Sequence, residues 1–298
     1  MLAQKNNVVH KNRYIRMKRS MLLGPYFDSN EQFSCNVAQT HDELKQAFSL
    51  VYKEYLRAGY VKKAVPSKML VNIYNLLPET VVWIVKSNHT VVSTLTEIFD
   101  SPLGLPIDEV YEKELDELRS EERRIVEISA LAIHKKHRWQ NAYMPLFRGM
   151  LQHALSRRAT DLCVAVNPKH KSFYKNILLF EDIGGKKNYP KVSAPSVALR
   201  LDLTTAEKKL EQIYGRMKPE SNLHEYFFQK NAIEDSPVEE FFQKKKEMDS
   251  NVIQYFFVKK NKILQELPPH QIEYFQSCYS DYDFSQIPNN KYASSMAG

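Results

Sequence analysis

Hydrophobic and polar positions repeat with two different periods at the start of the chain, and the periods predict different elements. Residues 33–39 alternate with a period of two, which is typical of a β-strand. Residues 44–56 instead place apolar side chains at helical spacing, after Thr40 and Glu43, which form a capping-box pattern. We therefore expect a strand followed by a helix.

The pattern continues as strands that alternate with helices. Strands are expected at 80–87, 90–98, 123–134, 161–166 and 196–203, and helices at 109–119, 144–155 and around 173–174. Such alternation implies that part of the sheet is parallel. The pattern therefore predicts an α/β fold with a mixed, partly parallel central sheet flanked by helices.

After residue 203 the strand pattern stops and helical signals take over. Capping-box patterns begin at Thr204 and at Ser236, apolar residues recur over 252–267, and a stripe rich in Phe and Tyr runs over 252–275. We therefore expect three parts. These are a basic N-terminal arm at 1–32, an α/β domain at 33–203 and a helical C-terminal extension at 204–298.

The composition is typical of a folded protein. Of 298 residues, 43% are hydrophobic and 26% are charged, and no apolar run approaches the roughly 18 residues that a membrane-spanning helix needs. The three cysteines are far apart and form neither a disulfide pattern nor a metal-binding pattern. The basic arm is followed by too short an apolar segment for an export signal. We therefore expect a cytoplasmic protein.

The net charge of +7 points toward an acidic partner. One interpretation is a nucleic-acid-binding module. Against it, the basic residues are not interleaved with aromatic residues in a base-stacking motif. We therefore keep nucleic-acid binding only as the non-enzymatic alternative.

One carboxylate stands in the middle of an apolar strand. Strand alternation would put Glu127, Ser129 and Leu131 on the same face. A buried carboxylate is costly unless it is hydrogen-bonded, and its pKa tends to be raised, so Glu127 is a candidate general base. The structural alternative is a salt bridge with Arg124 or another neighbour.

A second feature follows the strand at 161–166. Asn167 comes directly after this strand, and a helix carrying Phe173 and Tyr174 follows it. For most aromatic pairs in such a position, helix packing is the ordinary explanation.

Together the two features resemble the superfamily of GCN5-related N-acetyltransferases (GNAT). More narrowly, they resemble the FeeM-type N-acyl amino acid synthases, which are related to acyl-homoserine lactone synthases. The resemblance covers roughly residues 40–203, and its most distinctive part is Asp-Ser-Pro-Leu-Gly-Leu-Pro at 100–106. Further parts are 76–80, 92–96, 127–133 and 165–170. The resemblance implies a GNAT-like fold and transfer of a long fatty acyl chain from acyl carrier protein to the amine of an amino acid.

The resemblance also implies roles for particular residues. Glu127 would accept the proton of the substrate ammonium, directly or through water, and Tyr174 would protonate the leaving thiolate. Backbone amides near 131–133 would stabilise the tetrahedral intermediate. The expected acyl-pantetheine site comprises Ser129, Leu131, Ala132, Ile133, Arg138 and Asn167. Arg57 would bind the acceptor carboxylate, and Lys135, Lys136 and Arg148 would form a basic rim that steers an acidic carrier protein.

The implied reaction has no covalent enzyme intermediate, so Cys163 is expected in the core, and neither a bound cofactor nor a metal is required. The co-substrate would be an acyl-phosphopantetheine thioester, on acyl carrier protein or on coenzyme A. The loop at 138–143 lacks the glycines that coenzyme A-binding members usually place there, which favours the carrier protein. An acyl-CoA-dependent N-acyltransferase and a homoserine-lactone-synthase-like enzyme stay open as alternatives. No transmembrane segment is expected, although a lipid product would bring the protein near membranes.

Overall fold

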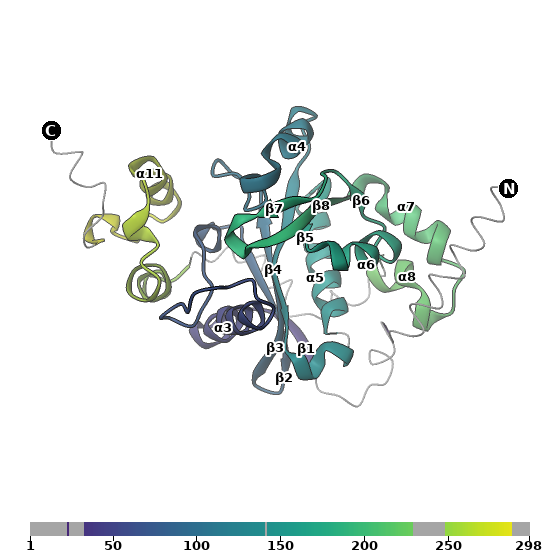
Figure 1. The fold of residues 1–298 in the computed structure, drawn as a ribbon, viewed down its shortest axis with the longest axis horizontal. Coiled ribbons are helices and arrows are strands. Elements are labelled where there is room, and N and C mark those ends of the chain that lie inside the picture. Colours follow the sequence, from purple (N-terminus) through teal and green to yellow (C-terminus); the bar gives the residue numbers. More distant parts are fainter. Residues whose placement is uncertain (1–22, 24–32, 141, 229–247, 288–298) are drawn as a thin grey trace.

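The computed structural model of the chain describes residues 23, 33–140, 142–228 and 248–287. A mixed sheet runs through the middle of this part, and helices cover both of its faces (Figure 1). The strands are β1 (Phe33–Val37), β2 (Val81–Ser87), β3 (Thr90–Phe99), β4 (Ile125–Ile133), β5 (Asp161–Val166), β6 (Glu181–Asp182), β7 (Lys187–Tyr189) and β8 (Ala194–Asp202). The main helices are α3 (His41–Arg57), α4 (Asp108–Ser120), α5 (Tyr143–Ser156), α6 (Lys171–Asn176), α7 (Leu203–Tyr214), α8 (Leu223–Phe228), α10 (Ser250–Ile253) and α11 (Pro269–Cys278).

The strand order in the sheet is β1-β2-β3-β4-β5-β8-β6, with β7 also paired to β8. The neighbours from β1 to β4 are antiparallel, β4 and β5 are parallel, and β8 is antiparallel to β5. The predicted mixed, partly parallel sheet is therefore confirmed. The short strands β6 and β7 were not expected from the pattern, because they contain few residues and most of these are not buried.

The start of α3 follows the capping-box prediction. The hydroxyl of Thr40 accepts a hydrogen bond from the amide of Glu43 at 3.2 Å, and the carboxylate of Glu43 accepts one from the amide of Thr40 at 3.2 Å. Two amides that have no partner within the helix are satisfied in this way. The residues that begin α3 are therefore set locally.

The capping box predicted at Thr204 is wrong. Helix α7 begins at Leu203, and its N-cap is Asp202, whose carboxylate accepts a hydrogen bond from the amide of Thr204 at 3.0 Å. The same carboxylate accepts a hydrogen bond from Arg123 at 2.8 Å. Helix α7 follows β8 without a loop, because β8 ends at Asp202. The capping box predicted at Ser236 lies outside the described residues.

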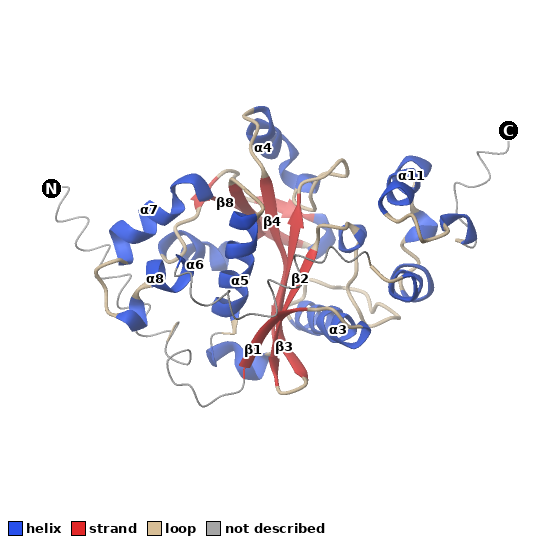
Figure 2. Cartoon of the chain, turned by 180° about the vertical axis from the view of Figure 1, so that it is seen from behind, coloured by secondary structure: helices blue, strands red, loops and turns tan. Residues whose placement is uncertain are grey.

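Two hydrophobic clusters fill the space on either side of the sheet. One cluster contains the buried faces of α5, α7 and α8, and the other contains those of α3, α4, α10 and α11. The two opposite views in Figures 1 and 2 show α5, α7 and α8 on one side of the sheet and α3 and α11 on the other. The chain after residue 203 therefore contributes to both faces of the sheet. Within the described residues, no helix is long and apolar enough to span a membrane.

Helix α5 lies very close to β2 because it carries a glycine at the contact. A Cβ atom on Gly149 would lie 2.7 Å from Cζ3 of Trp83, which is closer than carbon atoms pack. The indole of Trp83 is 1% exposed, and its Nε1–H donates to the carboxylate of Glu97 at 2.7 Å. The ring is therefore held in place and has no room to move away.

We predict that Gly149→Ala lowers the free energy of unfolding. Overpacking against Trp83 should cost about 1–3 kcal/mol, which exceeds the gain of at most about 1 kcal/mol from replacing a helical glycine. Urea denaturation would measure the difference. Gly185→Ala is the matched control, since nothing lies within 4 Å of its added Cβ. Equal unfolding midpoints for the two variants would contradict this account of the contact.

Candidate active site

Glu127 lies in the centre of the sheet, where β4 pairs with β3 on one side and with β5 on the other. Its side chain is 3% exposed, and its Oε2 accepts a hydrogen bond from the backbone amide of Ile107 at 2.8 Å. Burial raises the pKa of Glu127 to about 8; the Ile107 hydrogen bond opposes this rise and the carboxylate of Asp108 adds to it. None of the described Arg or Lys side chains forms an ion pair with Glu127, so the salt-bridge alternative with Arg124 is not seen.

The amide that reaches Glu127 is presented by the distinctive loop at 100–106 and the residues that follow it. Asp108 fixes the end of this loop, because its Oδ2 accepts a hydrogen bond from the amide of Leu105 at 2.7 Å. Arg119 holds both ends by donating to Asp100 and Asp108 at 2.6–3.0 Å. The loop is therefore a rigid support for the Glu127 carboxylate.

Three tyrosines from separate segments lie within electrostatic reach of Glu127. They are Tyr55 in α3, Tyr74 in the 3-10 helix Ile73–Leu76, and Tyr189 in β7. Burial is the largest cause of a raised pKa in all three, and the Glu127 carboxylate raises each pKa further. For Tyr74 the pKa reaches about 12. The sequence pattern did not point to these residues, since only the fold brings their segments together.

Tyr174 packs with the α5 cluster, whereas Tyr55 and Tyr74 pack with the α3 cluster on the other face of the sheet. Tyr174 is 4% exposed in α6, burial raises its pKa to about 12, and its charge would in turn raise the pKa of Tyr55. Its ring packs edge-to-face against Tyr143 at the start of α5, with ring centroids 6.4 Å apart. Tyr55 therefore lies within electrostatic reach of both Glu127 and Tyr174, the two residues expected to carry protons.

The strands β4 and β5 separate directly after Glu127. Their parallel register ends at the pair Glu127–Cys163, yet β4 continues to Ile133. In the described sheet, this last part of β4 pairs with β3 alone. One backbone edge of β4 is therefore left for a ligand in the opening between the two strands.

A β-bulge in β4 interrupts the alternation beyond Glu127. Ala130 has a left-handed backbone with φ of +49°, and the register to β3 shifts at this point. Leu131 then packs with the α5 cluster, whereas Ala130 and Ala132 pack with the α3 cluster. The prediction that Leu131 shares a face with Glu127 is therefore wrong, because the bulge inserts one residue and exchanges the faces.

Comparison with protein-family profiles places residues 46–202 in the family described as N-acyl amino acid synthase FeeM. The chain belongs to the FeeM family of N-acyl amino acid synthases. It is an N-acyltransferase enzyme with a GNAT-like fold, as the resemblance implied. A search of curated protein sequences found no match.

The solved structure of one relative shows the same fold, and two further structures are similar at lower TM-scores. FeeM, an N-acyl amino acid synthase from uncultured soil microbes, is 24% identical, covers 60% of this chain and 96% of its own, and has a TM-score of 0.53. The acyl-homoserine lactone synthase LasI is 14% identical over 62% of this chain and 96% of its own, with a TM-score of 0.49. The coenzyme A-dependent acyl-homoserine lactone synthase BjaI is 14% identical, covers 61% of this chain and 90% of its own, and has a TM-score of 0.47.

The structure shows the local surroundings of several residues that the FeeM resemblance implied. The hydroxyl of Ser129 lies close enough to Glu127 to lower its pKa by hydrogen bonding. The side chain of Asn167 accepts a hydrogen bond from the amide of Lys169 at 3.2 Å and so caps a short 3-10 helix. Arg57 ends α3 and pairs with the buried Glu54 at 2.5 Å. Cys163 is fully buried, which agrees with a core position.

The expected basic rim is only partly brought together. Lys135 and Lys136 are exposed in the 3-10 helix that follows β4, and Arg138 falls in the same helix, although its side chain lies outside the described part of the structure. Arg148 instead points away from this rim. It is half-buried, with its guanidinium 5.0 Å from the ring centroid of Tyr226.

A second buried carboxylate, also missed by the sequence pattern, lies on the other face of the sheet. Glu97 in β3 is 0% exposed, and its Oε2 accepts a hydrogen bond from Trp83 and lies 2.9 Å from Nδ1 of His153. Burial raises its pKa, whereas His153 and Trp83 lower it. These contacts join β2, β3 and α5, so Glu97 has a structural explanation.

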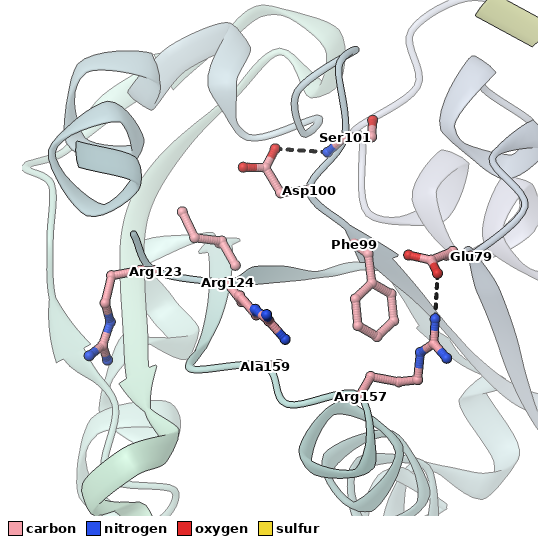
Figure 3. A pocket seen from close by; sticks show the side chains of 9 residues that line it. Glu79, Phe99, Asp100, Ser101, Arg123, Arg124, Arg157 and Ala159 are labelled. Atoms are coloured by element: carbon pink, nitrogen blue, oxygen red, sulfur yellow. Dashed lines mark hydrogen bonds and ion pairs between the residues drawn. The ribbon is translucent and has the colours of Figure 1, made fainter. Parts of the chain in front are cut away.

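An open pocket of about 470 Å³ lies at the start of β4, away from the opening between β4 and β5. Figure 3 shows its charged lining, in which Arg157 pairs with Glu79. Arg123 in the same lining pairs with Asp161 and Asp202. Two of the three arginines that line the pocket are therefore already paired with carboxylates, and the third, Arg124, is exposed. Among the described residues, no group of three His, Cys, Asp or Glu is placed to hold a metal ion.

We predict that Glu127→Gln changes how the free energy of unfolding depends on pH. The folded state raises the pKa of Glu127 from 4.5 to about 8, so its stabilising contribution is fully present below pH 4.5 and is lost as the pH rises to about 8. The variant lacks this loss and should therefore gain stability relative to the native protein between pH 5 and 8. Chemical denaturation at several pH values would measure it.

The control for this experiment is Glu112→Gln, which changes an exposed carboxylate on α4. Its curve of stability against pH should run parallel to that of the native protein. A parallel curve for Glu127→Gln as well would show that Glu127 is not held in a protonation-sensitive site.

Proposed function

We propose that the protein transfers a long fatty acyl chain from acyl carrier protein to the amine of an amino acid. The observation that carries this proposal is the position of Glu127. It is a buried carboxylate, held by the amide of Ile107, at the point where β4 and β5 separate in a member of the FeeM family. A candidate base therefore lies next to the point where the pairing of β4 with β5 ends, which supports a thioester site there.

The side chains supply the proton transfers that such a reaction needs. An amine attacks only after its ammonium has lost a proton, and a base with a pKa of about 8 accepts that proton efficiently near neutral pH. The amine nitrogen then forms a bond with the thioester carbon, and the carbon–sulfur bond breaks. As the amide forms, the nitrogen releases a second proton, which balances the proton that the thiolate takes up. Tyr174 remains protonated at neutral pH, because its pKa is about 12, and it donates a proton to the departing thiolate.

The free edge of β4 is suited to an acyl-pantetheine arm. The arm contains amide groups, which pair with an unpaired strand edge in the way an added strand does. Ser129, Ala132 and Ile133 lie along this edge, and the bulge takes the amides of Ala130 and Leu131 out of the ladder with β3, which resumes at Ala132. These amides would stabilise the oxyanion of the tetrahedral intermediate, with Arg138 and Asn167 farther along the arm.

The donor is proposed to be a carrier protein because of the basic helix after β4. Lys135 and Lys136 are exposed there, where they can meet an acidic surface. Helix α5 begins at Tyr143, and among the described residues its N-cap, Ala142, makes no side-chain capping hydrogen bond, so we propose that this helix N-terminus contributes to binding the single phosphate of the arm. The bulky loop at 138–143 suits one phosphate better than the diphosphate of coenzyme A.

The acceptor would enter from the side of α3. Tyr55 in this helix is within electrostatic reach of Glu127, and Arg57 follows it by two residues at the end of the helix. The guanidinium of Arg57 is 42% exposed, although one of its nitrogens is bonded to Glu54. We propose that it binds the carboxylate of the amino acid.

We predict that Glu127→Gln lowers kcat/KM by about 10²- to 10⁴-fold, because the amide cannot accept a proton. Release of free thiol from acyl carrier protein on addition of an amino acid would measure the rate, and mass spectrometry would identify the N-acyl product. The native rate should rise with pH to an apparent pKa near 8. Glu112→Gln is the control, and native turnover in Glu127→Gln would remove this residue from the mechanism.

We predict that the double variant Lys135→Glu with Lys136→Glu raises KM for acyl carrier protein. The effect should shrink as salt is added, because surface attraction is screened. KM for a small acyl-pantetheine donor should stay unchanged, since that donor does not need the docking surface. The control is Lys208→Glu with Lys218→Glu, two exposed lysines in α7 and after it. Equal effects on both donors, or faster turnover with acyl-CoA than with the carrier protein, would contradict the carrier-protein proposal.

A further inference from the structure

The C-terminal segment, residues 248–287, is bonded to a loop that is far away in the sequence. The hydroxyl of Tyr279 donates to the backbone carbonyl of Leu76 at 2.6 Å, and both residues are buried. The hydroxyl of Ser67 donates to Oδ1 of Asn261 at 2.7 Å, and Nδ2 of Asn261 donates to the carbonyl of Phe256 at 2.7 Å. Two side chains of the segment therefore form hydrogen bonds with the stretch between α3 and β2.

The same segment supplies part of the hydrophobic core. Phe256 and Phe257 are 0% exposed in the π-helix Gln254–Lys260, as is Phe275 in α11. They belong to the cluster that contains α3 and Leu76, and the ring of Phe256 packs edge-to-face on Phe48 with centroids 5.3 Å apart. Figures 1 and 2 both show α11 on the side of the sheet that carries α3. The segment is thus fixed to the body of the protein.

The stretch between α3 and β2 carries Tyr74, one of the tyrosines within electrostatic reach of Glu127. The 3-10 helix Ile73–Leu76 is closed at its start by reciprocal hydrogen bonds between Asn72 and Asn75, at 2.9 and 3.2 Å. At its end, the carbonyl of Tyr74 accepts a hydrogen bond from the hydroxyl of Thr80 at 2.7 Å. The carbonyl that Tyr279 holds belongs to the same turn, so a shift of Leu76 would move Tyr74.

We propose that the C-terminal segment is a positioning element of the active site. Tyr279 holds the turn at Ile73–Leu76, and Leu76 packs in the same hydrophobic cluster as Ile107, whose amide is hydrogen-bonded to Glu127. Through this packing the turn supports the acceptor side of the site, and so it affects how tightly the amine substrate is bound. The inference rests on the proposed N-acyltransfer to an amine. Tyr279 is a positioning residue rather than a catalytic one, because its contact is with Leu76. The segment lies outside the part of the chain that matches the FeeM family, which ends at residue 202.

The test compares two Tyr→Phe changes within the same segment of the full chain. Tyr279→Phe removes the hydrogen bond to Leu76 and keeps the ring. Tyr282→Phe is the matched control, since it removes a hydrogen bond to Gln254 at 2.6 Å that stays within the segment. Tyr279→Phe should raise KM for the amine about fivefold to tenfold, the factor that corresponds to one lost hydrogen bond, while KM for the acyl donor stays unchanged. Tyr282→Phe should keep both KM values.

A second measurement does not depend on activity. Hydrogen exchange of the backbone amides at 72–80 should become faster in Tyr279→Phe than in Tyr282→Phe, because the turn loses its anchor. Unchanged exchange in this stretch would overturn the positioning role. An equal rise of both KM values together with a lower Tm would also overturn it, since that result indicates a general loss of structure. If the native protein forms no N-acyl product, the proposed function fails, and hydrogen exchange alone still decides whether Tyr279 anchors the turn.

Discussion

A carboxylate inside the sheet is the constraint on which the rest of the site depends. Removing Glu127 from water costs several kcal/mol if the group is charged, and one hydrogen bond from a backbone amide returns only part of this. The protein accommodates the difference by raising the pKa of Glu127 to about 8. A buried carboxylate with a purely structural role would instead form an ion pair with a nearby cation. The raised pKa thus reflects an environment suited to accepting and releasing a proton.

The loop before α4 has a shape that lets the backbone amide of Ile107 donate a hydrogen bond to Glu127. To present Ile107 to Glu127, the chain must turn tightly at Gly104, which has a left-handed φ of +67° and no room for a Cβ beside Asp108. Arg119 then neutralises the two aspartates that close the loop, Asp100 and Asp108. A half-buried charged cluster therefore supports the loop that holds a buried carboxylate.

The geometry of the sheet provides the second requirement, a place for the thioester. Parallel pairing of β4 and β5 stops at Glu127, and the bulge at Ala130 redirects the strand immediately afterwards. A left-handed backbone at a residue other than glycine is uncommon and carries strain, and such strain concentrates at functional sites. The C-terminal segment adds a third requirement. It packs on α3 and fixes the turn that bears Tyr74, so a part of the chain beyond the family match shapes the site within it.

The sequence by itself determined the elements and the identity of the main carboxylate. Period-two and helical patterns located the strands and helices of the α/β part, because each depends on local burial, and Glu127 stood out as a charge within an apolar strand. Only the tertiary structure decided the face of Leu131, because a bulge leaves no mark on the alternation. It also placed Arg148 against Tyr226 and gathered Tyr55, Tyr74 and Tyr189 near Glu127. These placements rest on contacts between segments far apart in the chain, which no local pattern encodes.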